Sequence, residues 1–499
     1  MPPNDSDVDL SRPLLQDDEL GSESPLFDND FREQRDESAK PGSVRSRLHL
    51  YWRRRKRYIV LGLSYTAAVV LLAIVILIAI APKTPGADID VPPFNETLAY
   101  DPRLEKYQSP NDAATCPTWS PPLPHSSLTT TTNTSQFTST ISFTLPSDPS
   151  LTFFLTRGAP LLGNFIINRD RANGKEIAVD VIAEFDDEEI GKKVLESTKA
   201  CFAGRVEGDA KEQGVLLWAD PALDSFSPSP HVRFNISVHL ANIREFYDIS
   251  TDFTNPGTAF AHEIADFLDL WSPTAFGVVK LNARNAAMSV GTMLGPASYI
   301  STTNAKIDGS FWISEAAHVQ TSNAPVRGTV FALGHGEGSE VSVSIRTENA
   351  PVFAAMAIAS DFSYVKLNST ISTSNGALTV IGPRSMVTPY PSLFVLSGIT
   401  SNAPAIAHLH PEFEGSFDLA TAGVGWGGKA EVVWDENAGG RDPAGKGRTR
   451  RLDWSEGRRD RRRKSGRIVW GEEVVQENMG DVRLYTTGKD VTVVAQKAS

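Results

Sequence analysis

One uninterrupted apolar segment stands out in the hydrophobic pattern of the first hundred residues. Residues 59–81 span 23 positions without a charge, and only Ser64, Tyr65 and Thr66 among them are polar. A helix of this length extends about 34 Å, enough to cross a hydrocarbon core of about 30 Å. We therefore predict a transmembrane helix over residues 58–81. A signal peptide would begin near the N-terminus, whereas 58 residues precede this apolar segment.

Basic residues adjoin the N-terminal end of this segment, and only Lys83 lies close on the other side. The positive-inside rule then places residues 1–57 in the cytoplasm and the rest of the chain across the membrane, a type II topology. The expected location is the plasma membrane or an endomembrane such as the vacuole or endosome. The basic cluster consists of Arg53, Arg54, Arg55, Lys56 and Arg57.

The N-terminal tail is acidic and lacks an apolar period. Residues 1–50 hold 12 acidic and 6 basic residues, which predicts disorder over residues 1–57. Leu14 and Leu15 follow Asp9 in a pattern similar to an acidic dileucine sorting signal, although the acid lies five residues before the first leucine. Such a pair would bind a sorting adaptor. The alternative is two apolar residues in a solvated tail.

Strand-like alternation begins after a polar stem. Residues 82–135 are rich in Pro, Ser, Thr and Asn, and we expect an extended stem there. From 136 to 277, apolar and polar residues alternate with period two, as at Ile141, Phe143 and Leu145. This pattern predicts half-buried strands and the first, sandwich-like part of an all-β ectodomain. Helical periodicity is best developed over residues 187–200.

A repeated unit follows within residues 278–437. Five segments share the order aliphatic, any, Thr (once Ala), any, Asn, Ala or Gly, any, aliphatic, and their asparagines are spaced by 19, 19, 26 and 26 residues. A weaker sixth copy contains Asn402, and a degenerate seventh contains Thr421. The five asparagines are Asn285, Asn304, Asn323, Asn349 and Asn375.

The inward-facing parity changes at each of these asparagines, which predicts a corner between two strands. Asn tolerates left-handed backbone and bonds to local backbone, and stacked Asn corners can form an amide ladder. A period near 20 residues with one strand–corner–strand unit is typical of a β-solenoid. The alternative is an antiparallel sandwich with recurrent Asn turns.

The repeats TSNAPVRG and TSNGALTV resemble adhesin-like β-solenoid repeats of many bacterial and fungal surface proteins. With the tail and anchor, the chain is similar to a group of uncharacterised fungal type II single-pass membrane proteins. The resemblance covers about residues 278–430, less than a third of the chain, and it implies architecture rather than activity. It supplies no catalytic residues.

A basic segment interrupts the β pattern near the end of the chain. Residues 438–467 hold 12 basic and 4 acidic residues together with several Gly, and we expect a disordered insert there. Residues 468–499 contain the terminal strands. Cationic side chains in such a loop could bind anionic glycans or lipid headgroups. The alternative is a solvated loop without a binding role.

Composition limits the partners and the chemistry. A formal net charge of -12 argues against nucleic acid as a general partner, and two cysteines exclude a four-cysteine zinc site. Cys116 and Cys201 either form one disulfide or stay as two buried thiols. Glycosylation sequons beyond the anchor begin at Asn95, Asn133, Asn235 and Asn368.

No catalytic, cofactor-binding or metal-binding set emerges from the motifs. His262-Glu263 begins like a zinc-protease helix, but Asp266 stands where the second His is needed. The pair His408 and His410 lacks an obvious third ligand. Three acids in or near the repeats are better explained as turn residues than as a glycosidase pair: Asp308, Glu348 and Asp361.

We therefore expect a non-enzymatic type II membrane protein that presents a β-rich module for adhesion, glycan binding or assembly. Its partners would be the membrane, glycans or surface proteins, and sorting adaptors at the tail. Two alternatives stay open: a carbohydrate-active enzyme on a β-solenoid scaffold, and an endosomal or vacuolar sorting protein.

Overall fold

The chain divides into two compact units, Met1–Val91 and Pro92–Ser499, and the computed structural model describes residues of the second only. Within the described ranges, no helix is long and apolar enough to cross a membrane. The predicted membrane segment 58–81, the basic cluster 53–57, Leu14 and Leu15 lie outside them. The described ranges are 99–124, 137–146, 150–169, 176–207, 210–225, 232–240, 247–255, 257–266, 276–334, 338–360, 365–385, 393–422, 428–434, 447–455, 461–471 and 479–495.

Strands dominate this unit and belong to a single sheet, which confirms the all-β prediction. The one α-helix of the described residues, α2 (Glu188–Glu196), lies where the periodicity predicts a helix. The carboxylate of Asp187 caps it by accepting from the backbone N–H groups of Glu189 and Ile190. Gly191 packs so closely on the sheet that a Cβ there would overlap the ring of Phe185.

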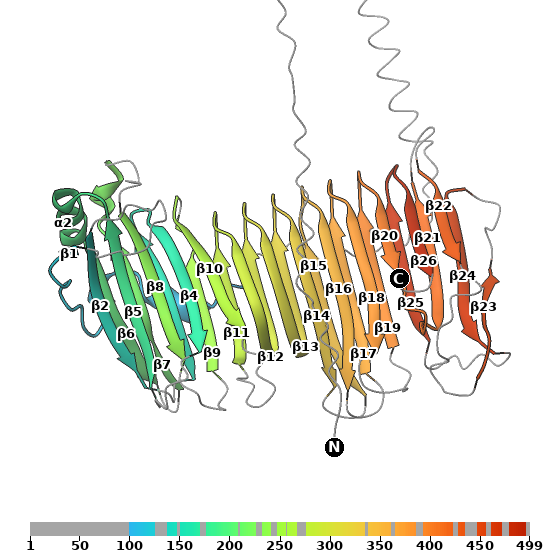
Figure 1. Cartoon of the computed structure of the whole chain (residues 1–499), viewed down its shortest axis with the longest axis horizontal. Coiled ribbons are helices and arrows are strands. Elements are labelled where there is room, and N and C mark those ends of the chain that lie inside the picture. Colours follow the sequence, from blue (N-terminus) through green and yellow to red (C-terminus); the bar gives the residue numbers. More distant parts are fainter. Residues whose placement is uncertain are drawn as a thin grey trace, which may run out of the picture. The chain divides into compact units, whose positions relative to one another are not determined.

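The sheet folds into two facing layers, which we call A and B (Figure 1). Two long strands, β12 (Met288–Thr302) and β13 (Ile307–Thr321), take part in both layers: the first half of each pairs within layer B and the second half within layer A. Layer A contains, in spatial order, β6 (Thr198–Glu207), β7 (Ala210–Ala219), β3 (Leu151–Gly158), β9 (Tyr247–Phe253), β11 (Phe276–Ala283), β12, β13, β15 (Ser339–Arg346), β17 (Val365–Thr373), β19 (Leu393–Thr400), β25 (Gly480–Thr486), β21 (Gly415–Thr421), β24 (Arg463–Trp470) and β23 (Arg450–Trp454). Layer B contains β1 (Leu123–Pro124), β2 (Phe137–Leu145), β5 (Ile177–Phe185), β8 (Val232–Leu240), β4 (Leu162–Arg169), β10 (Ala259–Asp266), β12, β13, β14 (Val326–Gly334), β16 (Val352–Ser360), β18 (Leu378–Ser385), β20 (Ala405–His408), β26 (Val491–Ala495) and β22 (Ala430–Trp434).

Neighbouring strands are parallel through most of both layers, so one strand of each layer and the corner between them form a coil that stacks on the next. This is the geometry of a solenoid. The solenoid also includes strands from residues 136–277, since β3 of layer A pairs in parallel with both β7 and β9. Antiparallel strands occur at the ends: β1, β2, β5 and β6 at one end, β23 and β24 at the other.

The two aliphatic positions of the repeat form two buried columns. Each column joins register partners in neighbouring strands, and every member is at most 1% exposed: Ile300, Val319, Ile345 and Ile371 in layer A, and Ile307, Val326, Val352 and Leu378 in layer B. The columns face each other, since a Cβ built on Gly328 of layer B would lie 3.9 Å from Cδ1 of Ile345. Burying one such side chain stabilises the fold by about 1.5–3 kcal/mol.

The spatial order of the coils departs from the sequence order at both ends. The first coil, β3–β4, lies between coils β7–β8 and β9–β10. The last coil, β25–β26, lies between coils β19–β20 and β21–β22. At the first end, a buried ion pair joins the inserted strand to its neighbour: Arg157 Nη2 of β3 lies 2.8 Å from Asp252 Oδ2 of β9. The first and the last coil of the sequence therefore each lie between two other coils rather than at an end of the stack.

Residues 99–124 differ from the extended stem that their composition predicts. Leu104 and Tyr107 are buried against the outer face of layer A together with Leu151, Phe153 and Leu216. The rings of Tyr107 and Phe153 stack with centroids 4.5 Å apart, and burial raises the pKa of Tyr107 to about 12. The outer face is apolar here, so a covering segment removes it from water.

The basic segment 438–467 also differs from the expected disordered insert. Its described residues form β23 and most of β24, which extend layer A beyond β21 in antiparallel pairing. Leu452 and Trp454 pack against the core, and the intervening charged residues alternate with them. A high density of charge concealed this period-two pattern.

Candidate binding face

The repeat asparagines lie in one row along the edge where the tight corners join layer A to layer B. From Asn304 onward, each side-chain amide donates from Nδ2 to the Oδ1 atom of the asparagine one coil earlier, over 2.7–2.8 Å. The row contains Asn285, Asn304, Asn323, Asn349, Asn375 and Asn402. These amides therefore bond coil to coil and are engaged in the fold rather than directed at a ligand.

The corner threonines form a second, buried row behind the asparagines. Thr347 Oγ1 donates to the carbonyl oxygens of Ser322 and Ala324 over 3.4 and 3.3 Å, and Thr373 Oγ1 donates to that of Ala350 over 3.0 Å. The corner carbonyls would otherwise be buried without partners, at a cost of about 1–3 kcal/mol each. This row explains why four of the five copies have Thr two residues before Asn.

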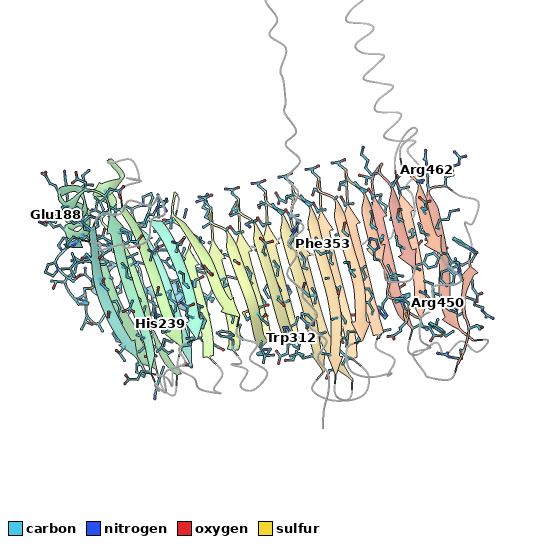
Figure 2. The ribbon with its side chains drawn as sticks, in the orientation of Figure 1. Glu188, His239, Trp312, Phe353, Arg450 and Arg462 are labelled. Carbon is cyan, nitrogen blue, oxygen red and sulfur yellow. A yellow bond between two sulfur atoms is a disulfide. The ribbon has the colours of Figure 1, made fainter. Side chains whose placement is uncertain are left out.

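The outer face of layer B carries an apolar band. It consists of one outward residue from each of six neighbouring strands: Trp312, Phe331, Phe353, Ile381, Ile406 and Val494. These residues lie at different positions along their strands: Trp312 and Phe331 are register partners, whereas Phe353 lies four residues nearer the corner than Ala357, the partner of Phe331. Phe353 and Ile381 are 41% and 40% exposed, and they are two of the four large exposed hydrophobic residues of the described part of the chain. The rings of Trp312 and Phe331 stack at 4.4 Å. Figure 2 shows Trp312 toward the loop edge and Phe353 toward the corner edge.

Side chains that can form hydrogen bonds lie beside the band, on the neighbouring strands. Arg327 and Thr379 are the register partners of Phe353 on either side, and His408 is the register partner of Ile381. Asp308, the register partner of Arg327, lies 3.0 Å from Lys306 Nζ. A flat apolar surface bordered by donors and acceptors can pack against one face of a ligand and bond to its rim.

The outer face of layer A is more polar in its central strands. Its central strands present hydroxyl groups in register, as in Ser344, Thr370 and Ser397. Tyr299 and His318 stack with ring centroids 5.1 Å apart, and burial lowers the pKa of His318. The exposed apolar side chains of Phe353 and Ile381 both lie on layer B.

Two of the four predicted glycosylation sites lie in the described residues, and both fall within strands. Asn235 Oδ1 on β8 accepts from Asn164 Nδ2 over 2.8 Å, and Asn368 on β17 donates to Glu340. Neither belongs to the apolar band. Asn95 and Asn133 lie outside the described residues.

Cys116 and Cys201 are joined in a disulfide that closes a separation of 85 residues. It ties the segment over layer A to β6, where Cys201 is fully buried. Sequence alone could not choose between this bond and two free thiols, because nothing in it fixed the distance between the two residues.

His262 lies in β10 rather than in a helix, and it is a buried structural residue. Its Nδ1 atom is 2.9 Å from the carbonyl oxygen of Phe260, so Nδ1 carries the proton. Nε2, 3.1 Å from Thr251 Oγ1, then accepts from that hydroxyl. Burial lowers the pKa of His262 to about 4, so the imidazole is neutral.

The other candidate ligands do not converge on a site. Among the described residues there is no group of three or more His, Cys, Asp or Glu side chains that could hold a metal ion. His410 lies 3.6 Å from Glu412, and His408 is exposed on the outer face of layer B. Glu348 lies at a corner, and Asp361 is outside the described residues.

Comparison with known proteins adds little to this geometry. No family model and no curated protein matches the sequence. A crystal structure of a "putative cell adhesion protein" from Clostridium sporogenes aligns with 8% sequence identity over 72% of this chain and 100% of that chain, with a TM-score of 0.19. A TM-score this low carries no argument about fold or function, so function must be argued from the faces described above.

Proposed function

We propose that this protein is a non-enzymatic adhesion module that binds an extended glycan along the outer face of layer B. The apolar band is the observation that carries the proposal. Soluble domains seldom leave large apolar side chains exposed near one another, and such patches commonly mark binding surfaces. Phe353 and Ile381, on adjacent strands, are the most exposed members.

The chemistry next to the band favours a sugar polymer as the ligand. A pyranose ring has an apolar C–H face, which packs on flat aromatic and aliphatic side chains, and a rim of hydroxyl groups. Arg327, Thr379 and His408 lie where they can bond to that rim. Each of the six neighbouring strands contributes one apolar side chain to the band, so an extended ligand could contact several coils.

The same proposal includes a membrane anchor at residues 58–81, with the β unit displayed on the lumenal or extracellular side. The uncharged segment and the flanking cluster Arg53–Arg57 support this orientation. Protease treatment of sealed vesicles tests it, since the β unit of intact vesicles should be protected and residues 1–57 digested. Digestion of the β unit instead would reverse the orientation.

Binding is tested by co-sedimentation of the full chain, in detergent, with insoluble polysaccharides of several linkage types. The double variant Phe353→Ser/Ile381→Ser should lose at least about tenfold in affinity, because each buried apolar side chain contributes about 1.5 kcal/mol or more. Ile399→Ser, on the outer face of layer A, is the matched control and should bind as the wild type does. Equal binding by all three proteins would rule out the apolar band as the site.

A further inference from the structure

The C-terminal end of the stack contains a guanidinium group in an unusual position. β22 and β23 are the last described strands of layers B and A, and Arg450 is the first residue of β23. Its side chain has the inward parity of Leu452, and its guanidinium carbon lies 4.8 Å from the centre of the Trp434 ring. Figure 2 shows Arg450 at this end of the stack.

Three buried N–H donors on the paired residues Arg450 and Trp470 have no acceptor among the described residues. Arg450 Nε and Nη2 have no hydrogen-bond partner, and neither has Nε1 of Trp470, the register partner of Arg450. The remaining nitrogen, Nη1, makes one long bond of 3.4 Å to the carbonyl oxygen of Ala495. Buried donors in native proteins nearly always have a partner, so a cluster of three calls for an acceptor.

Neighbouring carboxylates are already engaged by other cations. Glu414 Oε2 lies 3.3 Å from Arg448 Nη2, Asp418 Oδ2 lies 2.9 Å from Arg463 Nη2, and Asp453 pairs with Arg451 on the opposite face of β23. Burial lowers the pKa of Arg450 to about 10, and no carboxylate opposes that shift. Within the described residues, Arg450 is thus a half-buried cation without a counter-ion.

The surrounding charge favours an anion at this position. Residues 447–455 and 461–471 contain eight basic residues and one acidic residue, Asp453, a formal net charge of +7. The positive potential of such a cluster raises the local concentration of anions.

We propose that Arg450, Trp434 and Trp470 form a binding site for an oxyanion, a sulfate or carboxylate group that accepts from Arg450 Nε and Nη2 and from Trp470 Nε1. Guanidinium groups bind such oxyanions through paired N–H bonds, and the Trp434 ring holds the guanidinium plane in place. The group could belong to an acidic glycan or be free in solution. The site faces the space between the layers, whereas the apolar band lies on the outer face, so the two proposals can fail independently.

The test is thermal unfolding of the full chain in detergent, with sodium sulfate or sodium glucuronate replacing sodium chloride at constant ionic strength. Wild-type protein should show a saturable rise in unfolding temperature with at least one of these anions. Arg450→Met should weaken the apparent affinity about tenfold or more, since it removes bonds to a charged group. Sulfate and glucuronate then report which oxyanion the site prefers.

Arg451→Met is the matched control, because Arg451 lies in the same strand and the same basic cluster but faces outward and pairs with Asp453. It should respond to anions as the wild type does. An equal response in Arg450→Met and wild type would leave only a general salt effect and overturn the site.

A second measurement addresses the missing counter-ion. Without added anion, Arg450→Met should unfold at the same temperature as the wild type or higher, because it removes an uncompensated half-buried charge. A marked loss of stability in Arg450→Met under these conditions would mean that Arg450 already has a partner within the chain, which contradicts the proposal. Selenate soaked into crystals should give an anomalous peak beside Arg450.

Discussion

Thr486 donates its hydroxyl hydrogen to the carbonyl oxygen of Ala403, 3.0 Å away, although 83 residues separate the two along the chain. The bond continues the row of corner threonines into a coil from the end of the sequence. Register pairs Thr486 with Thr400 on one side and with Thr421 on the other. Among the described strands, β21 to β24 pair with the rest of the stack only through β25 and β26 of the last coil.

Deleting residues 479–495 tests this arrangement. Coils β19–β20 and β21–β22 would lose their common neighbour, and Leu484 and Val493, which are at most 1% exposed, would leave the core. We expect amide hydrogen exchange to accelerate throughout β21–β24 while β13–β17 stay protected. Deletion of residues 496–499 alone is the control and should change nothing. Unchanged protection of β21–β24 in the longer deletion would disprove the dependence.

The asparagine row predicts a position-dependent loss of stability. Asn349 makes two bonds along the row, with Asn323 and Asn375, whereas Asn402 makes one, with Asn375. Because a net hydrogen bond contributes about 1 kcal/mol, Asn349→Ala should lower the free energy of unfolding by about 2 kcal/mol and Asn402→Ala by about half as much. Urea denaturation measures both. Equal losses would show that the row does not act through these bonds.

Gly376 occupies the repeat position where the other well-matched copies have Ala, so alignment of the repeats would recommend Gly376→Ala. A Cβ at this position would lie only 1.9 Å from the backbone oxygen of Ala350. We therefore expect the substitution to destabilise the protein by about 1–3 kcal/mol. Gly328→Ala is the contrast, since its Cβ would meet nothing closer than 3.8 Å. That variant should be neutral or slightly stabilising in the same urea titration.

The corners show which features the sequence could reveal. Asn285 to Asn375 recur at spacings of 19 or 26 residues with aliphatic residues on either side, and this regularity was sufficient to predict strand, corner and strand. The inserted coils have corners of different sequence, such as Thr486-Thr487-Gly488, so no repeat pattern marked them. Their positions depend on pairing between distant strands, for which local periodicity carries no signal.

Local sequence patterns could not predict the binding face or the buried cation either. Outward residues of the band lie up to 182 positions apart in the sequence, from Trp312 to Val494, and only the pairing of neighbouring strands places them on one face of layer B. The sequence showed a basic segment but not that Arg450 points inward, because that orientation follows from its antiparallel pairing with β24.

His262 predicts a pH dependence of stability. Its pKa of about 4 in the fold lies below the ordinary value of 6.5, so between these values the unfolded chain binds more protons than the folded one. The free energy of unfolding should therefore fall as the pH decreases from 6.5 toward 4, by about 3 kcal/mol from this residue.

The difference in stability between wild type and His262→Gln isolates this contribution. Wild type should lose its advantage progressively over that pH range, as followed by chemical denaturation at each pH. His408→Gln removes a solvent-exposed histidine and serves as the comparison. A wild-type advantage that stays constant from pH 6.5 to 4 would contradict the buried neutral imidazole.

The most direct test of the proposed function is the affinity of the full chain for oligosaccharides of increasing length, taken from whichever polysaccharide co-sediments with it. The band crosses six neighbouring strands, so its five intervals span about 24 Å. Isothermal titration should show affinity that rises with chain length and reaches a plateau once the oligosaccharide covers that distance, with the rise abolished in Phe353→Ser/Ile381→Ser. Affinity that is independent of length, or that is unchanged in the double variant, would contradict a glycan-binding face on layer B.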